Sequence, residues 1–145
     1  MKKNLIYFFI LLTLITGCQR FDSNYYFKSL EKLQEMEEKI DSDLYDIRVA
    51  IKPVSEHEYI YYITLDNAKV DLNNLSMLVY HDVDTTNSFP SIGYLDEKAN
   101  IDDEVKGINL VGYIEKKSDF ELINFKIKVS TKNFDNIHVI TLDRD

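Results

Sequence analysis

The sequence predicts a mainly β protein, an antiparallel β-sandwich preceded by one amphipathic helix. From about residue 43 onward, β-branched and aromatic residues alternate with polar residues at a period of two, and turn-forming residues separate the runs. No long helical segment lies between these runs, so the crossovers that parallel strands require are not expected. A chain of 145 residues suits a single domain.

Residues 21–41 have the periodicity of an amphipathic helix. Apolar side chains recur at steps of three and four residues, and charged side chains fill the other face. The apolar positions are Tyr26, Leu30, Leu33, Met36 and Ile40. The helix either packs on the following domain, serves as a spacer, or binds a partner. We favour a packed helix or a spacer, because short helices gain most of their stability from tertiary contacts.

About seven segments are expected to form strands. In the most regular of them, Ile123, Phe125 and Ile127 alternate with polar residues, so that one face turns inward. The segments are residues 47–52, 57–65, 76–83, 91–95, 108–115, 122–131 and 137–142. Residues 96–104 are polar and acidic and are expected to form a loop.

The number and spacing of these segments favour an immunoglobulin-like arrangement of two packed sheets. A small β-barrel is the alternative. A true immunoglobulin domain carries a pair of cysteines and a buried tryptophan. This chain has one cysteine and no tryptophan, so the likeness is one of architecture only.

The first 17 residues have the parts of an export signal. Two lysines precede a nearly apolar run at residues 5–15, which is too short to span a bilayer but fits a secretory signal of about 7–15 apolar residues. The string LITGC at residues 14–18 follows. It resembles the lipobox of bacterial lipoproteins, in which an aliphatic residue and small residues precede an invariant cysteine, here Cys18.

The resemblance covers the export signal only, and what it implies concerns location. It implies that the thiol of Cys18 receives a covalent lipid and that residues 1–17 are removed. Residues 18–42 would then form the lipidated N-terminus with the helix or spacer, and residues 43–145 the sandwich. The protein would stand on the cell membrane, or on the outer membrane of a two-membrane envelope, facing away from the cytoplasm. Because Cys18 is the only cysteine, the domain would contain no disulfide.

The charge of the chain excludes one class of partner. Without the two lysines of the signal, 15 basic residues remain against 25 acidic ones, a net charge of −10. A nucleic-acid-binding protein needs a basic surface, so nucleic acid is not an expected partner. The same balance argues against a polybasic contact with membrane lipids.

The sequence contains no recognised catalytic motif, and we expect no catalytic residue and no cofactor apart from the lipid on Cys18. None of the three histidines has a metal-binding spacing. His81 is followed by Asp82 and Asp84, which suggests an envelope hydrolase as an alternative hypothesis. Neighbouring strand residues point to opposite faces, however, which weakens a pairing of His81 with Asp82.

Asp82 and Asp84 are also the residues most suggestive of a metal. They offer oxygen ligands at alternate positions, as the start of a calcium loop does. The loop lacks the glutamate at the twelfth place, which Gly93 occupies. A solvated acidic loop is therefore the commoner explanation, and a calcium site would be one of low affinity.

Tyrosines suggest a binding surface. The chain has ten of them, and residues 57–65 carry aromatic or apolar side chains on both faces, with Tyr59 and Tyr61 on one and Tyr62 on the other. Either the second face is covered by another element, or tyrosines are exposed to bind a protein or a glycan. The sequence thus favours a non-enzymatic binding or accessory module. An immunity or inhibitor lipoprotein that blocks a basic toxin is a further alternative.

Overall fold

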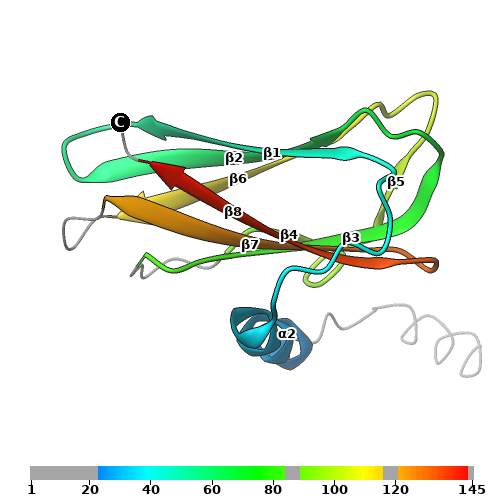
Figure 1. Cartoon of the computed structure of the whole chain (residues 1–145), viewed down its shortest axis with the longest axis horizontal. Coiled ribbons are helices and arrows are strands. Elements are labelled where there is room, and N and C mark those ends of the chain that lie inside the picture. The colour runs from blue at the N-terminus through cyan, green and yellow to red at the C-terminus, as the bar shows by residue number, and fades with distance from the viewer. Residues whose placement is uncertain (1–22, 84–88, 116–120, 144–145) are drawn as a thin grey trace, which may run out of the picture.

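The computed structural model describes residues 23–83, 89–115 and 121–143. These residues form one helix and eight strands, arranged as two antiparallel sheets with the helix beneath (Figure 1). The elements are α2 (Ser23–Glu35), β1 (Asp46–Pro53), β2 (Glu58–Asp66), β3 (Leu72–His81), β4 (Ser91–Ile92), β5 (Ala99–Ile101), β6 (Ile108–Glu115), β7 (Leu122–Ser130) and β8 (Asp135–Asp143). The predicted mainly β sandwich with one N-terminal helix is confirmed.

The strand order is that of an immunoglobulin-like sandwich. One sheet has the order β1-β2-β6, and the other has the order β4-β3-β7-β8, with β5 also paired to β3. The third strand leaves the sheet of the first two, and the sixth returns to it, as in the immunoglobulin-like Greek key. The described strands form two separate sheets that do not close, so the alternative of a small barrel is wrong.

One predicted loop contains a strand. β5 lies within the acidic segment 96–104 and pairs with the start of β3, which begins four residues before the predicted run. A bulge separates the Leu72 and Leu75 pairs, and Asn74 within it has a φ of 54°. Asparagine tolerates this left-handed conformation better than most residues. Because the bulge breaks the two-residue period, the sequence pattern does not reveal this part of β3.

The core lies between the two sheets. Alternate side chains of β2 and β6 face alternate side chains of β3 and β7, and together they bury the largest apolar cluster. The most deeply buried members are Tyr61, Ile63, Leu65, Leu75, Met77, Val79, Ile114, Ile123, Phe125, Ile127 and Val129. The inward face predicted for residues 122–131 is confirmed.

Gly112 makes room for the ring of Tyr61. The two residues are paired across β2 and β6. A Cβ atom at position 112 would lie 2.0 Å from Cζ of Tyr61 and 2.2 Å from its hydroxyl oxygen. Only glycine leaves the space that the aromatic ring occupies inside the sandwich.

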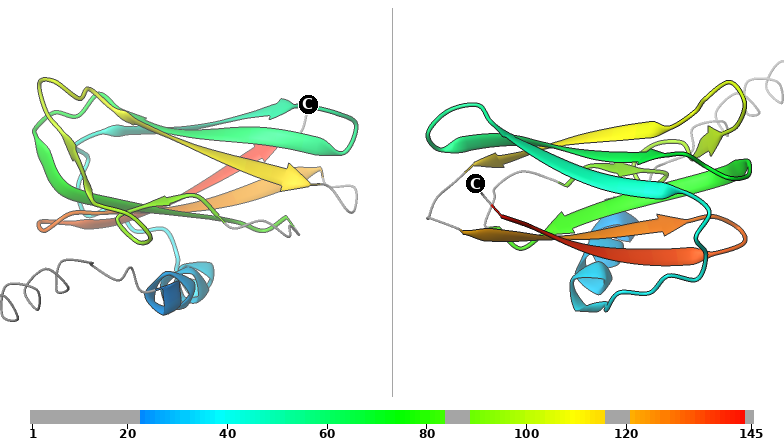
Figure 2. Two further views of the ribbon diagram at one scale, coloured as in Figure 1. Left: turned by 180° about the vertical axis from the view of Figure 1, so that it is seen from behind. Right: turned by 45° about the horizontal axis from the view of Figure 1, so that its top comes forward.

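Helix α2 packs against the outer face of the β4-β3-β7-β8 sheet, on the side away from the β1-β2-β6 sheet (Figure 1, and from behind in Figure 2). Its side chains Tyr26, Leu30 and Leu33 form a second apolar cluster with residues of the sheet and of the β4–β5 connection. Opposite the helix, the cluster consists of Leu78 and Ile137 of the sheet and Tyr94 of the β4–β5 connection, with Tyr80 and Phe89 at its border. The helix is therefore packed on the domain rather than a free spacer.

The helix ends at Glu35, earlier than the predicted residue 41. The ammonium group of Lys126, on β7, donates hydrogen bonds to the carbonyl oxygens of Gln34 (2.6 Å) and Met36 (2.7 Å), which satisfies the end of the helix. Beyond it, Lys39 pairs with Ile137 through two backbone hydrogen bonds of 2.9 and 2.6 Å. Ile40 is 48% exposed, so its predicted place on the apolar helix face is wrong.

Asn136 holds the segment that connects the helix to β1. Its side-chain oxygen accepts hydrogen bonds from the amides of Asp41 (2.8 Å) and Ser42 (3.1 Å). Its amide nitrogen donates to the carbonyl of Ser42 (2.7 Å) and to the hydroxyl of Tyr45 (2.8 Å). The Tyr45 hydroxyl lies 2.9 Å from Nε2 of His138. Asn136 is fully buried, and its amide group uses all four of its hydrogen-bonding positions.

We predict that Asn136→Ala lowers the free energy of unfolding by about 2–4 kcal/mol, because it leaves partly buried backbone groups of residues 41–42 and the buried Tyr45 hydroxyl without this partner. Urea denaturation followed by circular dichroism measures the loss. The matched control is Asn109→Ala, which removes an exposed amide that accepts a hydrogen bond from Thr64 on the sheet surface. Equal losses for the two variants would contradict the role assigned to Asn136.

Candidate functional site

The outer face of the β1-β2-β6 sheet carries an apolar and aromatic surface. The strand register places Ala50, Tyr62 and Val111 in one row across the sheet. The next row consists of Lys52, Ile60 and Tyr113. We call the four side chains of Ile60, Tyr62, Val111 and Tyr113 the outer-face patch.

Charged groups border the outer-face patch and hold its rings. The ammonium group of Lys52 lies 5.5 Å from the centre of the Tyr62 ring, in a cation–π contact. The hydroxyl of Tyr113 donates a hydrogen bond to the carboxylate of Glu58. This bond raises the pKa of Tyr113 to about 12 and lowers the pKa of Glu58. Tyr113 is therefore a neutral donor at physiological pH, and its ring is held in place.

No described element packs on the outer-face patch. Figure 1 shows that α2 covers the other sheet, at the opposite side of the sandwich. Val111, on the edge strand β6, is 53% exposed. A contiguous apolar surface on a small domain commonly marks a site of interaction.

The structure separates the three tyrosines that the sequence brought to attention. Tyr61 is 1% exposed and lies in the core against Phe125 and His81. Tyr59 shares its inward face and packs against the core cluster. Only Tyr62 belongs to the outer-face patch. Its neighbours on β6, Val111 and Tyr113, were not identified from the sequence, since only the pairing of β2 with β6 brings them beside Tyr62.

His81 lies inside the sandwich and not in an accessible site. It is 1% exposed and is surrounded by the rings of Tyr61, Phe89 and Phe125 at centroid distances of 4.8–5.6 Å. Neither ring nitrogen completes a hydrogen bond with a described residue. Burial lowers the pKa of His81 to about 4, although the charge of Asp82 and the backbone of Val83 act in the opposite direction.

The carboxylate of Asp82 does not converge with His81. Its two oxygens accept hydrogen bonds from the backbone amide (2.9 Å) and the side-chain amide (2.5 Å) of Asn124. The described residues therefore do not assemble the acid–base pair that the hydrolase hypothesis needs. Asp84 lies outside the described residues, so the predicted calcium ligands are placed only in part. Within the described ranges, no group of three or more His, Cys, Asp or Glu side chains could hold a metal ion.

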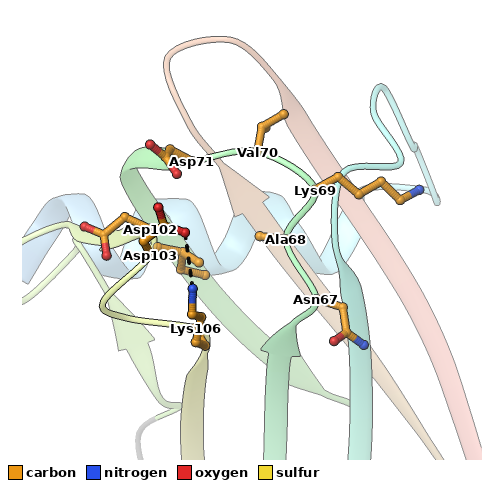
Figure 3. A pocket seen from close by; sticks show the side chains of 9 residues that line it. Asn67, Ala68, Lys69, Val70, Asp71, Asp102, Asp103 and Lys106 are labelled. Carbon is orange, nitrogen blue, oxygen red and sulfur yellow. Dashed lines mark hydrogen bonds and ion pairs between the residues drawn. The ribbon is translucent and has the colours of Figure 1, made fainter.

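A hollow of about 390 Å³ lies at one end of the sandwich, between the β2–β3 and β5–β6 connections (Figure 3). Its wall carries charges of both signs, which are largely engaged with one another. Asp103 pairs with Lys106 at 3.3 Å, and Lys69 reaches Asp43 at 2.9 Å. The carboxylate of Asp102 accepts hydrogen bonds from two backbone amides of its own loop, which lowers its pKa. Several polar groups that line this hollow are thus paired within the protein, which does not favour a ligand site.

Cys18 and the lipobox lie outside the described residues, so the lipid anchor stays a prediction. Among the described residues, no helix is both long and apolar enough to cross a membrane. Comparison with protein-family models, with curated proteins and with solved structures finds no match to this chain.

We predict that acidification destabilises the fold through His81. The folded pKa of about 4 lies below the ordinary value of 6.5, so the unfolded chain binds more protons between these two pH values. The contribution of His81 to stability is complete above pH 6.5 and is lost as the pH falls toward 4. The loss is about 3 kcal/mol by pH 4.

The measurement is the free energy of unfolding in urea between pH 4 and pH 7. In His81→Leu, part of the pH dependence should disappear, because the buried group that titrates is gone. His57→Gln, which changes an exposed histidine, should keep the slope of the unaltered protein. If the curves for His81→Leu and the unaltered protein are parallel, the assignment to His81 is wrong.

Proposed function

We propose that this chain is a lipid-anchored, non-enzymatic binding module that presents its outer-face patch to a protein partner outside the cytoplasm. The observation that carries the proposal is the contrast between the two sheets. One sheet has its outer face covered by α2, whereas the other carries Ile60, Tyr62, Val111 and Tyr113 with no described element upon them.

The composition of the patch favours a protein partner over a glycan. A sugar stacks on the faces of aromatic rings, whereas two of the four side chains of this patch, Ile60 and Val111, are aliphatic, and Val111 is the most exposed of the four. Protein interfaces combine an apolar centre with tyrosines and a polar rim. Lys52 and Glu58 supply charges of both signs at the rim. They favour a partner with mixed charge at the corresponding positions.

The lipobox resemblance at residues 14–18 supports the anchor. Each buried methylene group contributes about 0.8 kcal/mol, so a single chain binds weakly while several acyl chains on one residue hold a protein firmly. A lipid on Cys18 would also confine the domain to the membrane, where a partner tethered to the same membrane meets it at high effective concentration.

The anchor is tested by metabolic labelling with a clickable palmitate analogue in a bacterium that expresses the full chain. The unaltered protein should take up the label and migrate without residues 1–17. Cys18→Ser should take up none and keep the longer precursor mass, since both lipid transfer and cleavage need the thiol. Gln19→Ala, at the neighbouring position, should behave as the unaltered protein. Labelling of Cys18→Ser would show that the lipid is not on this residue.

The partner surface is tested by photo-crosslinking in the same cells. With p-benzoylphenylalanine in place of Val111, we expect one discrete protein adduct. The matched control carries the same group in place of Val70, which is 50% exposed at the loop hollow against 53% for Val111. Val111→Glu should abolish capture by a crosslinker placed at Lys52, and should change stability by about 0.5 kcal/mol or less because the site is on the surface.

The outcomes separate the alternatives. An adduct at position 70 and none at 111 would move the binding site to the loop hollow. An adduct of twice the chain mass that contains only this protein would identify the partner as a second copy. If no protein adduct forms at position 111, the proposal of a protein partner on the outer-face patch is overturned.

A further inference from the structure

The first turn of α2 exposes two aromatic side chains. Tyr25 and Phe27 are each 57% exposed, while Tyr26 between them is 1% exposed and points into the sheet. Because successive residues of a helix are about 100° apart, burying Tyr26 turns its two neighbours to the two flanks of the helix. Exposing the surface of a large aromatic side chain to water is unfavourable in free energy. Two such side chains at one end of a helix suggest that this end contacts something apolar.

These two rings are held in place by the fold. The Tyr25 ring stacks on Tyr94 with a centroid distance of 5.6 Å and an interplanar angle of 14°. The Phe27 ring contacts the edge of Tyr26 at 5.1 Å. Leu95, which follows Tyr94 in the chain, is also exposed, at 42%. Each of the two exposed rings at this end of the molecule is therefore held by contact with a second ring.

The surface lies close to Cys18 along the chain. Five residue steps separate Cys18 from Ser23, the first residue of α2, so the helix begins within about 17 Å of the proposed lipid attachment point. The outer-face patch is on the far side of both sheets (Figure 1). Two packed sheets are about 10 Å apart and a helix adds about 10 Å, so the patch stands on the order of 20 Å beyond the helix.

The charges along α2 indicate which part of it meets the membrane. Lys28 belongs to the same end as the two exposed aromatic rings. Farther along the helix Glu31, Lys32 and Glu35 are exposed, and acidic groups outnumber the lysine there. A tilt that brings the first turn nearest to the membrane keeps these carboxylates farther from anionic lipid headgroups than a helix lying flat would. The outer-face patch, across both sheets from the helix, still faces away from the bilayer (Figure 1). Contact through the first turn brings the two aromatic rings and Lys28 to the surface, and these residue types favour the membrane–water interface.

We infer that the first turn of α2 seats Tyr25 and Phe27 in the headgroup region of the membrane that holds Cys18, and so orients the domain with its outer-face patch away from the bilayer. The inference rests on the lipid anchor of the proposed function and adds an orientation to it. Two aromatic rings alone would bind a membrane weakly. The tether makes their insertion an intramolecular step, which a small interaction energy is sufficient to favour.

The test uses two features of the sequence. Cys18 is the only cysteine, so residues 18–145, which contain every described element, can be attached there to a maleimide lipid in vesicles of phosphatidylcholine and phosphatidylglycerol. The chain has no tryptophan, so Phe27→Trp introduces a single fluorescent probe of its surroundings. On attachment, the emission of Phe27→Trp should move to shorter wavelength and be quenched by brominated acyl chains. Tyr25→Trp provides the same test at the other flank of the helix should the first variant fail to fold.

The matched control is Val111→Trp, which is similarly exposed on the outer-face patch and should show neither change. Adding Tyr25→Ser to Phe27→Trp should reduce the quenching, because half of the inserted surface is lost. If attached Phe27→Trp keeps the emission and the quencher insensitivity of the free protein, the inference is overturned. Equal quenching at positions 27 and 111 would mean a domain without fixed orientation and would overturn it as well.

This design keeps the inference separate from the anchor itself. The chemical attachment at Cys18 does not depend on cellular lipidation. A loss of palmitate labelling in cells would overturn the anchor while the vesicle measurement still reports on the helix. Normal palmitate labelling in cells, together with an unquenched probe at position 27 in vesicles, would support the anchor and overturn the inferred orientation.

Discussion

The fully satisfied amide of Asn136 is the contact on which the arrangement of the three layers depends. It lies on β8, in one sheet, and holds the backbone of Asp41 and Ser42 as the chain passes from the helix layer to the other sheet. Its bond to Tyr45 extends the same network to the start of β1. A buried amide is costly unless all of its bonds are made, so this arrangement of four bonds strongly favours one path for the connection.

That path decides which surfaces stay bare. Because the connection is held along β8, α2 packs on the sheet that contains β8 and covers it with Tyr26, Leu30 and Leu33. The β1-β2-β6 sheet then has no described layer over its outer side, although β2 carries apolar side chains on both of its faces. The molecule thus has two different ends: an aromatic helix turn near the proposed anchor, and an apolar sheet face far from it.

The fold was largely predictable, and the candidate site was not. Regular alternation in residues 122–131 identified β7 because this strand buries one face. β5 has only three residues in an acidic segment, too few to show a period. The helix was predicted to extend to residue 41 because Ile40 continues the helical spacing, although Ile40 is exposed. Tyr61 and Tyr62 are adjacent in sequence, yet one lies in the core and the other belongs to the surface patch.

The sequence by itself determined the class of fold, the acidic charge and the prediction that Cys18 carries a lipid, since each depends on local pattern or on composition. The tertiary structure decided which apolar residues remain exposed. Val111 and Tyr113 join Tyr62 only through the pairing of β2 with β6, and His81 loses its suggested role because its strand turns it into the sandwich. Burial is a property of what packs on a residue. That depends on contacts between segments far apart in the chain, which periodicity within one segment does not contain.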